Sequence, residues 1–319
     1  MNSISRRTFL AGSAGAAALA LTACGGSGSS DASGDKTYKI GVLQLTQHAA
    51  LDAANEGFVE ALDASGIKYT VDQQNANNDQ SACATIASKL VGDGDDLIFA
   101  IATPAAQAVA AATSDIPIVG SAITDYAASG LVADNDKPGG NLTGTSDMNP
   151  VDDQIAMLQK VLPEAKHIGM LYCTAESNSQ LQIEMAEAAC DKAGLTTERF
   201  TVSSSNEIQS VVESMVGKVD AGYSPTDNTI AAAAAQVGQI AKEGKLPFIT
   251  GEENMCMGMG ICTVSIDYKE LGKMAVKILK GEDTPANMAI ETEAGDQLQT
   301  IKNEEMAEAL GIDLSMLDA

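Results

Sequence analysis

Short apolar segments alternate with segments of helical periodicity in two successive series, and no other feature of the sequence constrains the fold as strongly. Apolar runs bounded by polar residues are typical of buried strands, and apolar residues at helical spacing are typical of packed helices. The first series predicts strands at 38–45, 67–71, 96–102 and 116–120, with helices at 49–64, 80–91 and 103–113. Such alternation predicts parallel sheets with helices on both faces.

The second series repeats this order, with helices predicted at 154–162, 180–193, 208–216 and 229–242 and strands at 167–172, 196–202, 219–223 and 246–250. Each series has the length of an ordinary domain. We therefore expect an α/β fold of two doubly wound parallel-sheet lobes joined by a hinge, with lobe 1 at 37–148 and lobe 2 at 149–265. A helix at 268–280 and a strand at 298–301 should cross back, so that 266–284 completes lobe 1 and 285–319 completes lobe 2.

The first residues have the parts of a bacterial export signal, namely a charged start, a short apolar stretch and small residues at a cleavage site. Arg6 and Arg7, followed by Phe-Leu, resemble a twin-arginine signal, and Leu-Thr-Ala before Cys24 resembles a lipobox. We expect removal of 1–23, lipidation of Cys24 and a Gly/Ser-rich tether at 24–36, which together hold an extracytoplasmic protein at the cell membrane. The alternative is an ordinary secretory signal in which a cysteine happens to stand at this position.

Composition excludes several classes of function. The formal net charge is −24, and a phosphate backbone would repel such a surface, which argues against nucleic-acid binding. Trp is absent and aromatic residues make up 3%, so a platform for stacking bases is not indicated. Neither a Gly-x-Ser-x-Gly elbow nor a Walker motif occurs, so we expect no enzyme activity, no cofactor and no metal.

Polar residues gather where the predicted strands end. In open parallel sheets, ligands bind beyond the carboxyl ends of the strands, where helix N-termini offer unpaired N–H groups. The residues that we expect to bind a ligand there are Gln44, Thr46, His48, Thr103, Ala105, Ser121, Thr124, Asp125, Glu176, Asn178, Asp227, Asn228 and Glu253.

The two predicted lobes offer different chemistry at these strand ends. Lobe 1 offers hydroxyls and amides, whereas lobe 2 offers the acids Glu176, Asp227, Glu252 and Glu253. A carboxylate suits the first set and an ammonium the second, so we expect an α-amino acid between the lobes. In the sharpest form of this hypothesis, Asp227 accepts the ammonium, while Thr103 and nearby backbone N–H groups hold the carboxylate. The alternative is that such residues are only helix N-caps.

Several segments resemble the ABC-transporter substrate-binding family that includes tryptophan- and phenylalanine-type binding lipoproteins. The matching segments are QHAALD at 47–52, NA at 75–76, ATPAAQ at 102–107, IPIV at 116–119, GGNLTG at 139–144, ESNS at 176–179, TDN at 226–228 and DYKELG at 267–272. The resemblance implies a type I periplasmic-binding-protein fold that closes like a hinge around an amino acid, most simply an aromatic one. It also implies an ABC permease and its ATPase as partners. Ala49 and Tyr126 stand where the family usually has proline.

Alternatives of other kinds stay open from the sequence. A ligand-sensing lipoprotein subunit of a signalling system would need the same cleft and anchor, and so would a binding protein for a solute that is not an amino acid. The sulfur-rich stretch at 255–262 offers soft ligands of the kind that select Cu(I). Its other interpretation is a loop and strand of core-filling residues, in which Cys256 and Cys262 are free or form a disulfide.

Overall fold

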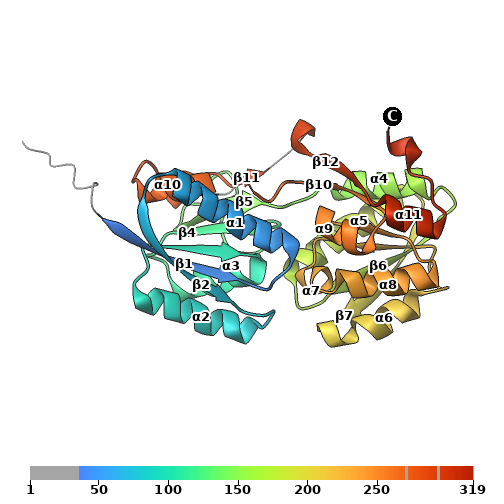
Figure 1. The fold of residues 1–319 in the computed structure, drawn as a ribbon, viewed down its shortest axis with the longest axis horizontal. Helices are drawn as coiled ribbons and strands as arrows, with labels where there is room; N and C mark the ends of the chain where they lie inside the picture. Colours follow the sequence, from blue (N-terminus) through green and yellow to red (C-terminus); the bar gives the residue numbers. More distant parts are fainter. Residues whose placement is uncertain (1–35, 270–271, 293–294, 319) are drawn as a thin grey trace, which may run out of the picture. The chain divides into compact units, whose positions relative to one another are not determined.

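The computed structural model describes residues 36–269, 272–292 and 295–318, which form two α/β lobes (Figure 1). The first lobe is built on a six-stranded sheet of order β11-β5-β4-β3-β1-β2, and its strand pairs are parallel. The strands are β1 (Thr37–Gln44), β2 (Lys68–Asn75), β3 (Leu97–Ile101), β4 (Ile118–Ile123), β5 (Leu142–Ser146) and β11 (Glu291–Thr292).

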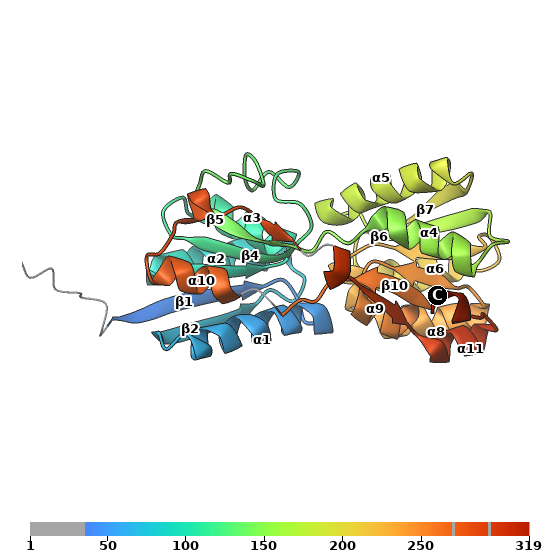
Figure 2. The ribbon, with the colours of Figure 1, turned by 90° about the horizontal axis from the view of Figure 1, so that it is seen from above.

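Four helices cover this sheet: α1 (Ala49–Ala64), α2 (Gln80–Asp93), α3 (Thr103–Ala112) and α10 (Gly272–Leu279). Local signals set their ends. The Asp79 carboxylate accepts from the N–H groups of Ser81 and Ala82 at the start of α2, and Gly94 ends the helix with a φ of 70°. Figures 1 and 2 both show α10 beside the strands of this lobe, and Met274 and Leu279 belong to the same buried core as Phe58.

The second lobe has a six-stranded sheet of order β12-β10-β9-β8-β6-β7. Its strands are β6 (His167–Cys173), β7 (Thr196–Val202), β8 (Ala221–Ser224), β9 (Phe248–Thr250), β10 (Cys262–Ser265) and β12 (Gln299–Lys302). Its helices are α4 (Val151–Val161), α5 (Ser177–Lys192), α6 (Ile208–Met215), α7 (Asn228–Ala231), α8 (Ala234–Gly244), α9 (Glu253–Met259) and α11 (Glu304–Leu310). Strand β12 runs antiparallel to β10, whereas the other pairs are parallel. Two buried clusters form the core of this lobe.

The chain passes between the two sheets after β5, after β10 and after β11. Each lobe is therefore made of segments that are distant in sequence. The first lobe takes in β11 at residues 291–292, which lie beyond the 266–284 expected to complete it, because β11 pairs with β5.

The predicted fold class is confirmed, and the structure also shows elements that the sequence patterns did not predict. Strands β5 and β10 and helices α9 and α11 were not predicted, and the helix expected at 229–242 is two helices, α7 and α8. The stretch between them is a run of alanines with no glycine or proline, so its composition holds no signal for the break. The stretch at 255–262, for which a loop and a strand were one interpretation, begins within α9 and ends at the first residue of β10.

Candidate functional site

A small cavity of about 10 Å³ lies where strands of both sheets reach their carboxyl ends. Its lining comes from many elements: His48, Ala50 and Leu51 at the start of α1, Ala122 in β4, Asp147 after β5, Asn178 in α5, Thr226, Asp227 and Asn228 after β8, Ala231 in α7, Glu252 and Met255 around the start of α9, and Tyr268 after β10. Parallel sheets place ligand sites at this edge because the loops and helix starts converge there.

Three carboxyl groups line this cavity, and their hydrogen bonds differ. Asp227 accepts from the backbone N–H of Ile230 at 2.9 Å with one oxygen and from that of Cys173 at 2.7 Å with the other. Glu252 accepts from the backbone N–H groups of Asn254 and Met255, both at 2.6 Å. Both therefore act as N-caps, a role that the alternative interpretation of the sequence gave to Asp227 but not to Glu252.

Asp147 has a free acceptor. Its Oδ2 accepts from the hydroxyl of Tyr268 at 3.3 Å, while its Oδ1 is buried and has no partner among the described residues. Asp147 follows β5 and Tyr268 follows β10, so this pair joins two of the segments that cross between the lobes. Neither residue was among the predicted ligand-binding residues. Asp147 was missed because β5, with the sequence LTGTS, is short and weakly apolar.

Burial raises the pKa of each of these three carboxyl groups. The pKa of Asp147 is raised to about 6 and that of Glu252 to about 7, in each case chiefly by loss of water. Loss of water also raises the pKa of Asp227, and the nearby Glu176 carboxylate adds to the effect. Among the described residues, no lysine or arginine lines the cavity. The charge of these acids must therefore be balanced by protons or by a ligand.

Glu176 plays a structural role behind the lining residue Asn228. Its Oε1 accepts from the N–H and the hydroxyl of Thr229, at 2.9 and 2.7 Å, and its Oε2 accepts from the N–H and the side-chain amide of Asn228, at 3.0 and 2.6 Å. These bonds hold the first turn of α7. The amide of Asn228 in turn accepts a hydrogen bond from His48 of the first lobe, over 3.2 Å.

A second group of polar atoms without partners lies at the ends of β3 and β4. The hydroxyls of Thr103 and Ser121 are buried and have no hydrogen-bond partner in the described part of the chain. Thr103 is the first residue of α3, whose first-turn N–H groups are available to an anion. The backbones of Ala102 and Ala122 have φ values of 84° and 54°, which non-glycine residues rarely adopt and which cluster at functional sites.

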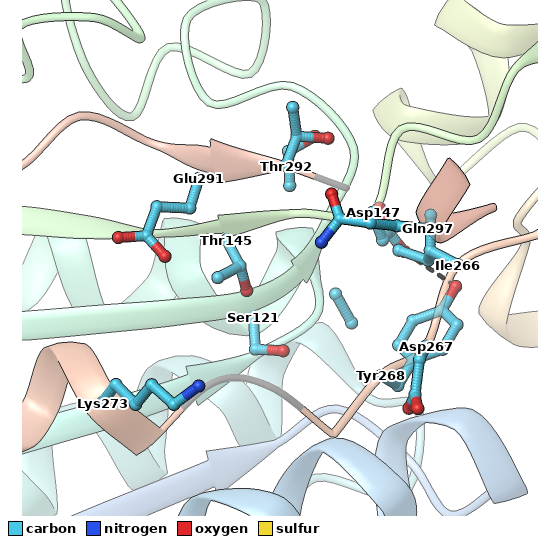
Figure 3. Close-up of a pocket in the computed structure, with 12 residues that line it drawn as sticks. Ser121, Thr145, Asp147, Ile266, Asp267, Tyr268, Lys273, Glu291, Thr292 and Gln297 are labelled. Carbon is cyan, nitrogen blue, oxygen red and sulfur yellow. Dashed lines mark hydrogen bonds between the residues drawn. The ribbon is translucent and has the colours of Figure 1, made fainter. Parts of the chain in front are cut away.

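A larger cavity of about 180 Å³ adjoins the first and shares Ala122, Asp147 and Tyr268 with it. Figure 3 shows Asp147, Ile266 and Gln297 at one end of this cavity, Ser121 and Thr145 in the middle, and Glu291 and Lys273 at the other end. Most of the open space beside Asp147 therefore lies in this larger cavity.

The structure places the other predicted residues outside the cavity. Gln44 donates to the Thr46 carbonyl at 2.8 Å and to Asp52 at 2.6 Å, so its amide supports α1. Thr124 accepts from Gln182 at 3.3 Å, and Asp125 caps a turn by accepting from Ala128 at 2.9 Å.

Two further predicted residues, Ala105 and Glu253, also lack a place in the cavity wall. Ala105 is packed in the core, whereas Glu253 is exposed and its neighbour Glu252 takes the buried position. Of the thirteen predicted ligand-binding residues, the lining includes His48, Asn178, Asp227 and Asn228.

The sulfur-rich stretch forms part of the core of the second lobe. Cys256 and Cys262 are buried and not bonded to each other, Met255 and Met259 are buried in the same lobe, and Met257 is exposed. Within the described ranges, no group of three or more His, Cys, Asp or Glu side chains is placed to hold a metal ion.

The expected export signal, Cys24 and nearly all of the tether lie outside the described residues. Among the helices that the structure does describe, none combines the length and apolar character needed to span a membrane.

Comparison with known proteins identifies relatives along nearly the whole chain. Residues 39–316 match the model of a family described as ABC transporter substrate binding protein. The chain is 38% identical over 300 residues to the tyrosine-binding protein of Clostridioides difficile strain R20291, a match that covers 88% of this chain and 87% of the relative.

Two solved structures of similar sequence differ in how well they superimpose. An ABC domain from Streptococcus pneumonia in complex with L-Trp is 40% identical, with a TM-score of 0.84 and coverage of 89% of this chain and 98% of that one. A ligand-free, open substrate binding protein with adhesive properties from Clostridium difficile is 41% identical, with a TM-score of 0.65 and coverage of 86% and 95%.

Proposed function

Because the chain belongs to the ABC transporter substrate binding protein family, we propose that it captures a free amino acid with an aromatic side chain in the cavity lined by His48, Asp147 and Asp227. One observation carries the proposal. The cavity wall has three buried carboxyl groups and no lysine or arginine among its described residues. A buried charge requires a partner, and the ammonium of an amino acid provides one. The tyrosine-binding and L-Trp-bound relatives support this class of ligand.

The ammonium binds at Asp147 in this proposal. Asp147 Oδ1 has no partner, whereas each oxygen of Asp227 already accepts a backbone N–H. A charge-assisted hydrogen bond from an ammonium is stronger than a neutral one, and it also keeps the buried carboxylate ionised. Asp227 and Glu252 then contribute negative charge from the cavity wall. This assignment replaces Asp227 as the first choice for the ammonium.

The carboxylate binds toward the ends of β3 and β4. Ser121 lies opposite Ile101 in the sheet, and Thr103 follows Ile101 by two residues, so both free hydroxyls lie at the same edge. The start of α3 adds N–H groups and the positive end of a helix dipole. The carboxylate of the amino acid is then held by the first lobe, and its ammonium by Asp147 at the crossing segment that follows β5.

The family supports the choice of partners, and the N-terminal sequence supports the place of action. We propose that the loaded protein delivers its ligand unchanged to an ABC permease driven by an ATPase. We further propose export by the N-terminal signal and anchoring through Cys24, which rest on the sequence alone. A neighbouring permease and ATPase gene pair would support transport over a sensing role.

Native mass spectrometry of the purified protein, followed by calorimetric titration with the free amino acids, tests the ligand class. We expect an amino acid to copurify and to bind again after it has been removed. If the copurified ligand lacks an amine, the amino-acid proposal fails while membership of the binding-protein family stands. If no amino acid binds to the ligand-free protein, the proposal fails as well.

A further inference from the structure

The lining of the cavity has two more buried acceptors without a partner among the described residues, on the ring of His48 and on the side-chain amide of Asn178. The Nδ1 atom of His48 is buried and makes no hydrogen bond to any described residue. His48 lies just before α1 and lines the cavity together with Leu51 of that helix. Which of its ring nitrogens carries the proton decides what kind of group the ring can bind.

The hydrogen bonds of Glu176 determine, through Asn228, which ring nitrogen of His48 carries the proton. Glu176 Oε2 accepts from the side-chain amide nitrogen of Asn228 at 2.6 Å, and a carboxylate can only accept when it is ionised. The amide of Asn228 therefore presents its nitrogen to Glu176 and its oxygen, Oδ1, to His48. The orientation of an Asn amide is assigned from its hydrogen-bond network, and this network permits one orientation.

Asn228 in turn fixes the tautomer of His48. Asn228 Oδ1 can only accept, so the His48 Nε2, 3.2 Å away, must carry the hydrogen. Burial also lowers the pKa of His48, which keeps the ring neutral. In a neutral imidazole with the proton on Nε2, Nδ1 is a lone-pair acceptor. The ring therefore requires a donor from the ligand on its buried side.

We propose that His48 Nδ1 accepts a hydrogen bond from a donor on the ligand's side chain, so that the cavity selects aromatic amino acids that carry a hydroxyl or an N–H over phenylalanine. The inference rests on the proposed function and adds the chemical class of the side chain. Beside its acids and amides, the lining includes the apolar side chains of Ala50, Leu51, Ala231 and Met255. Apolar contacts together with a neutral acceptor suit an aromatic ring that carries a donor.

The ammonium is a poorer candidate for this position. The same cavity offers an ammonium three carboxyl groups, including the unpaired oxygen of Asp147. A cation prefers an ionised acceptor to a neutral imidazole, because charge-assisted hydrogen bonds are about twice as strong as neutral ones. The neutral acceptor is therefore left for a neutral donor.

Phenylalanine would leave Nδ1 buried without a partner. A site built to bind a ligand hydroxyl rejects the analogue that lacks it, because the buried acceptor then remains unpaired. We expect the wild-type protein to bind L-tyrosine at least about tenfold more tightly than L-phenylalanine, which corresponds to a loss of about 1.4 kcal/mol.

Calorimetric titration with L-tyrosine, L-tryptophan and L-phenylalanine tests the assignment in two variants of His48. In His48→Gln the longer amide reaches the Nε2 position and keeps a polar group toward Asn228, but it places no acceptor at Nδ1. In His48→Asn the shorter amide places an acceptor near the Nδ1 position. We expect His48→Gln to lose the preference for tyrosine over phenylalanine, and His48→Asn to keep part of it.

Asn78→Gly provides the matched control. Asn78 donates to the Thr229 hydroxyl at 2.9 Å and so links the first lobe to the same turn of α7, but it does not line the cavity. Its φ of 62° suits glycine. This variant should change the affinities for the three amino acids by the same factor. In contrast, loss of the His48 acceptor should change the preference for tyrosine over phenylalanine.

Nitrogen NMR of the wild-type protein provides a readout without any variant. The chain has two histidines, so labelling with ¹⁵N-histidine gives the signals of two rings. We expect the His48 Nδ1 signal of an unprotonated nitrogen, shifted by L-tyrosine and much less by L-phenylalanine.

The outcomes separate the two proposals. Failure of every amino acid to bind would overturn the proposed function. Binding of tyrosine and phenylalanine with equal affinity would overturn the His48 assignment alone. A protonated Nδ1 would also overturn it, and so would an equal loss of affinity for all three ligands in His48→Gln. In either case His48 would not bind a donor on the ligand's side chain.

Discussion

Buried carboxyl groups in one cavity can have different tasks, and their hydrogen bonds distinguish them. The oxygens of Asp227 accept the backbone N–H groups of Ile230 in α7 and of Cys173 at the end of β6, and those of Glu252 accept N–H groups at the start of α9, so each oxygen supports the fold. Asp147 keeps one oxygen without a partner. At the scale of single residues, we therefore expect substitutions of these acids to have separable effects on ligand affinity and on stability.

The first prediction compares Asp147→Asn with Asp227→Asn. Asp147→Asn removes the charge that pairs with the ammonium, and since an unpaired buried charge costs on the order of 2–5 kcal/mol, amino-acid affinity should fall about 30-fold or more. In Asp227→Asn the amide nitrogen cannot accept, so one backbone N–H of Ile230 or Cys173 loses its partner and the free energy of unfolding should fall by about 1–3 kcal/mol. Titration and thermal unfolding without ligand measure the two effects. A reversed pattern would return the ammonium to Asp227.

The second prediction concerns pH. The pKa of Asp147, raised to about 6, means that ammonium binding must drive off a proton below that pH. Amino-acid affinity should then decrease as pH falls from 7 to 5, by up to about tenfold per unit for one coupled proton. Calorimetry in buffers of different ionisation enthalpy should detect proton release near pH 6. A constant affinity over this range would exclude Asp147 as the ammonium partner.

The same pKa shifts have the opposite effect on the stability of the ligand-free protein, to which their contribution decreases as pH rises. Asp147 and Glu252 hold their protons more tightly in the folded state, with pKa values of about 6 and 7. Their contribution to stability is therefore fully present below the unfolded pKa of about 4 and is lost as pH rises through 6 to 7. Without ligand these two groups favour the folded state in mild acid, whereas ligand binding favours neutral pH.

At the scale of elements, strong periodicity was enough to predict most of the fold. Helix α1 has the predicted bounds of 49–64, because its apolar residues keep helical spacing and Gly66 follows directly. The alternation of strands and helices also placed His48, Asn178, Asp227 and Asn228 at one edge. What the patterns could not supply was the partner of each polar atom, which depends on residues distant in sequence.

The missed parts of the site share a physical cause. Asp147 and Tyr268 lie beside β5 and β10, strands of five and four residues that are too short for a clear period. Glu252 and Glu253 are adjacent acids, and only the observed start of α9 decides which of them is buried. Short elements are defined by their neighbours in the sheet, so their residues cannot be placed from local pattern alone.

The third prediction tests the packing of α1 against the segment that crosses back into the first lobe. A Cβ added at Gly57 would clash with the Lys269 carbonyl, and one added at Gly272 would clash with Ala61. Gly57→Ala should lower the free energy of unfolding by about 1–3 kcal/mol, as overpacking does. Gly92 is an exposed residue of α2 with open space around it. Gly92→Ala should therefore leave the free energy of unfolding unchanged or raise it by up to about 1 kcal/mol. Urea unfolding compares the two.

At the scale of the whole molecule, hydrogen bonds join the lobes around the cavity. Asn228 accepts from His48, Thr229 from Asn78 and Thr124 from Gln182, and each of these three bonds crosses from one lobe to the other. Such bonds can persist only when the lobes are close. They support a hinge-type closure of the two lobes around a ligand.

The fourth prediction follows from this closure. Addition of the copurified ligand to ligand-free protein should decrease the radius of gyration in small-angle scattering. Asn78→Gly removes one of the bonds between the lobes and should shift the ligand-free protein toward the open form. A scattering profile that is identical with and without saturating ligand would contradict a hinge mechanism.

The fifth prediction concerns the proposed anchor. Cys24→Ser removes the thiol that would receive the lipid, so the protein should leave the membrane fraction and appear in a soluble fraction. Cys83→Ser is a suitable control, because Cys83 is buried in the first lobe and its thiol is not exposed for modification. Membrane association of Cys24→Ser that persists until detergent is added would contradict lipidation at this residue.

The three passages of the chain between the sheets have a consequence for how the molecule is made. The edge strand of the first sheet, β11, lies at residues 291–292, and the edge strand of the second, β12, lies at 299–302. Neither lobe can be cut out as one continuous fragment, and neither sheet is complete until the ribosome has nearly finished the segment that the structure describes. The two lobes therefore mature together, late in synthesis, and a nascent chain that stops before residue 291 exposes unfinished edges of both.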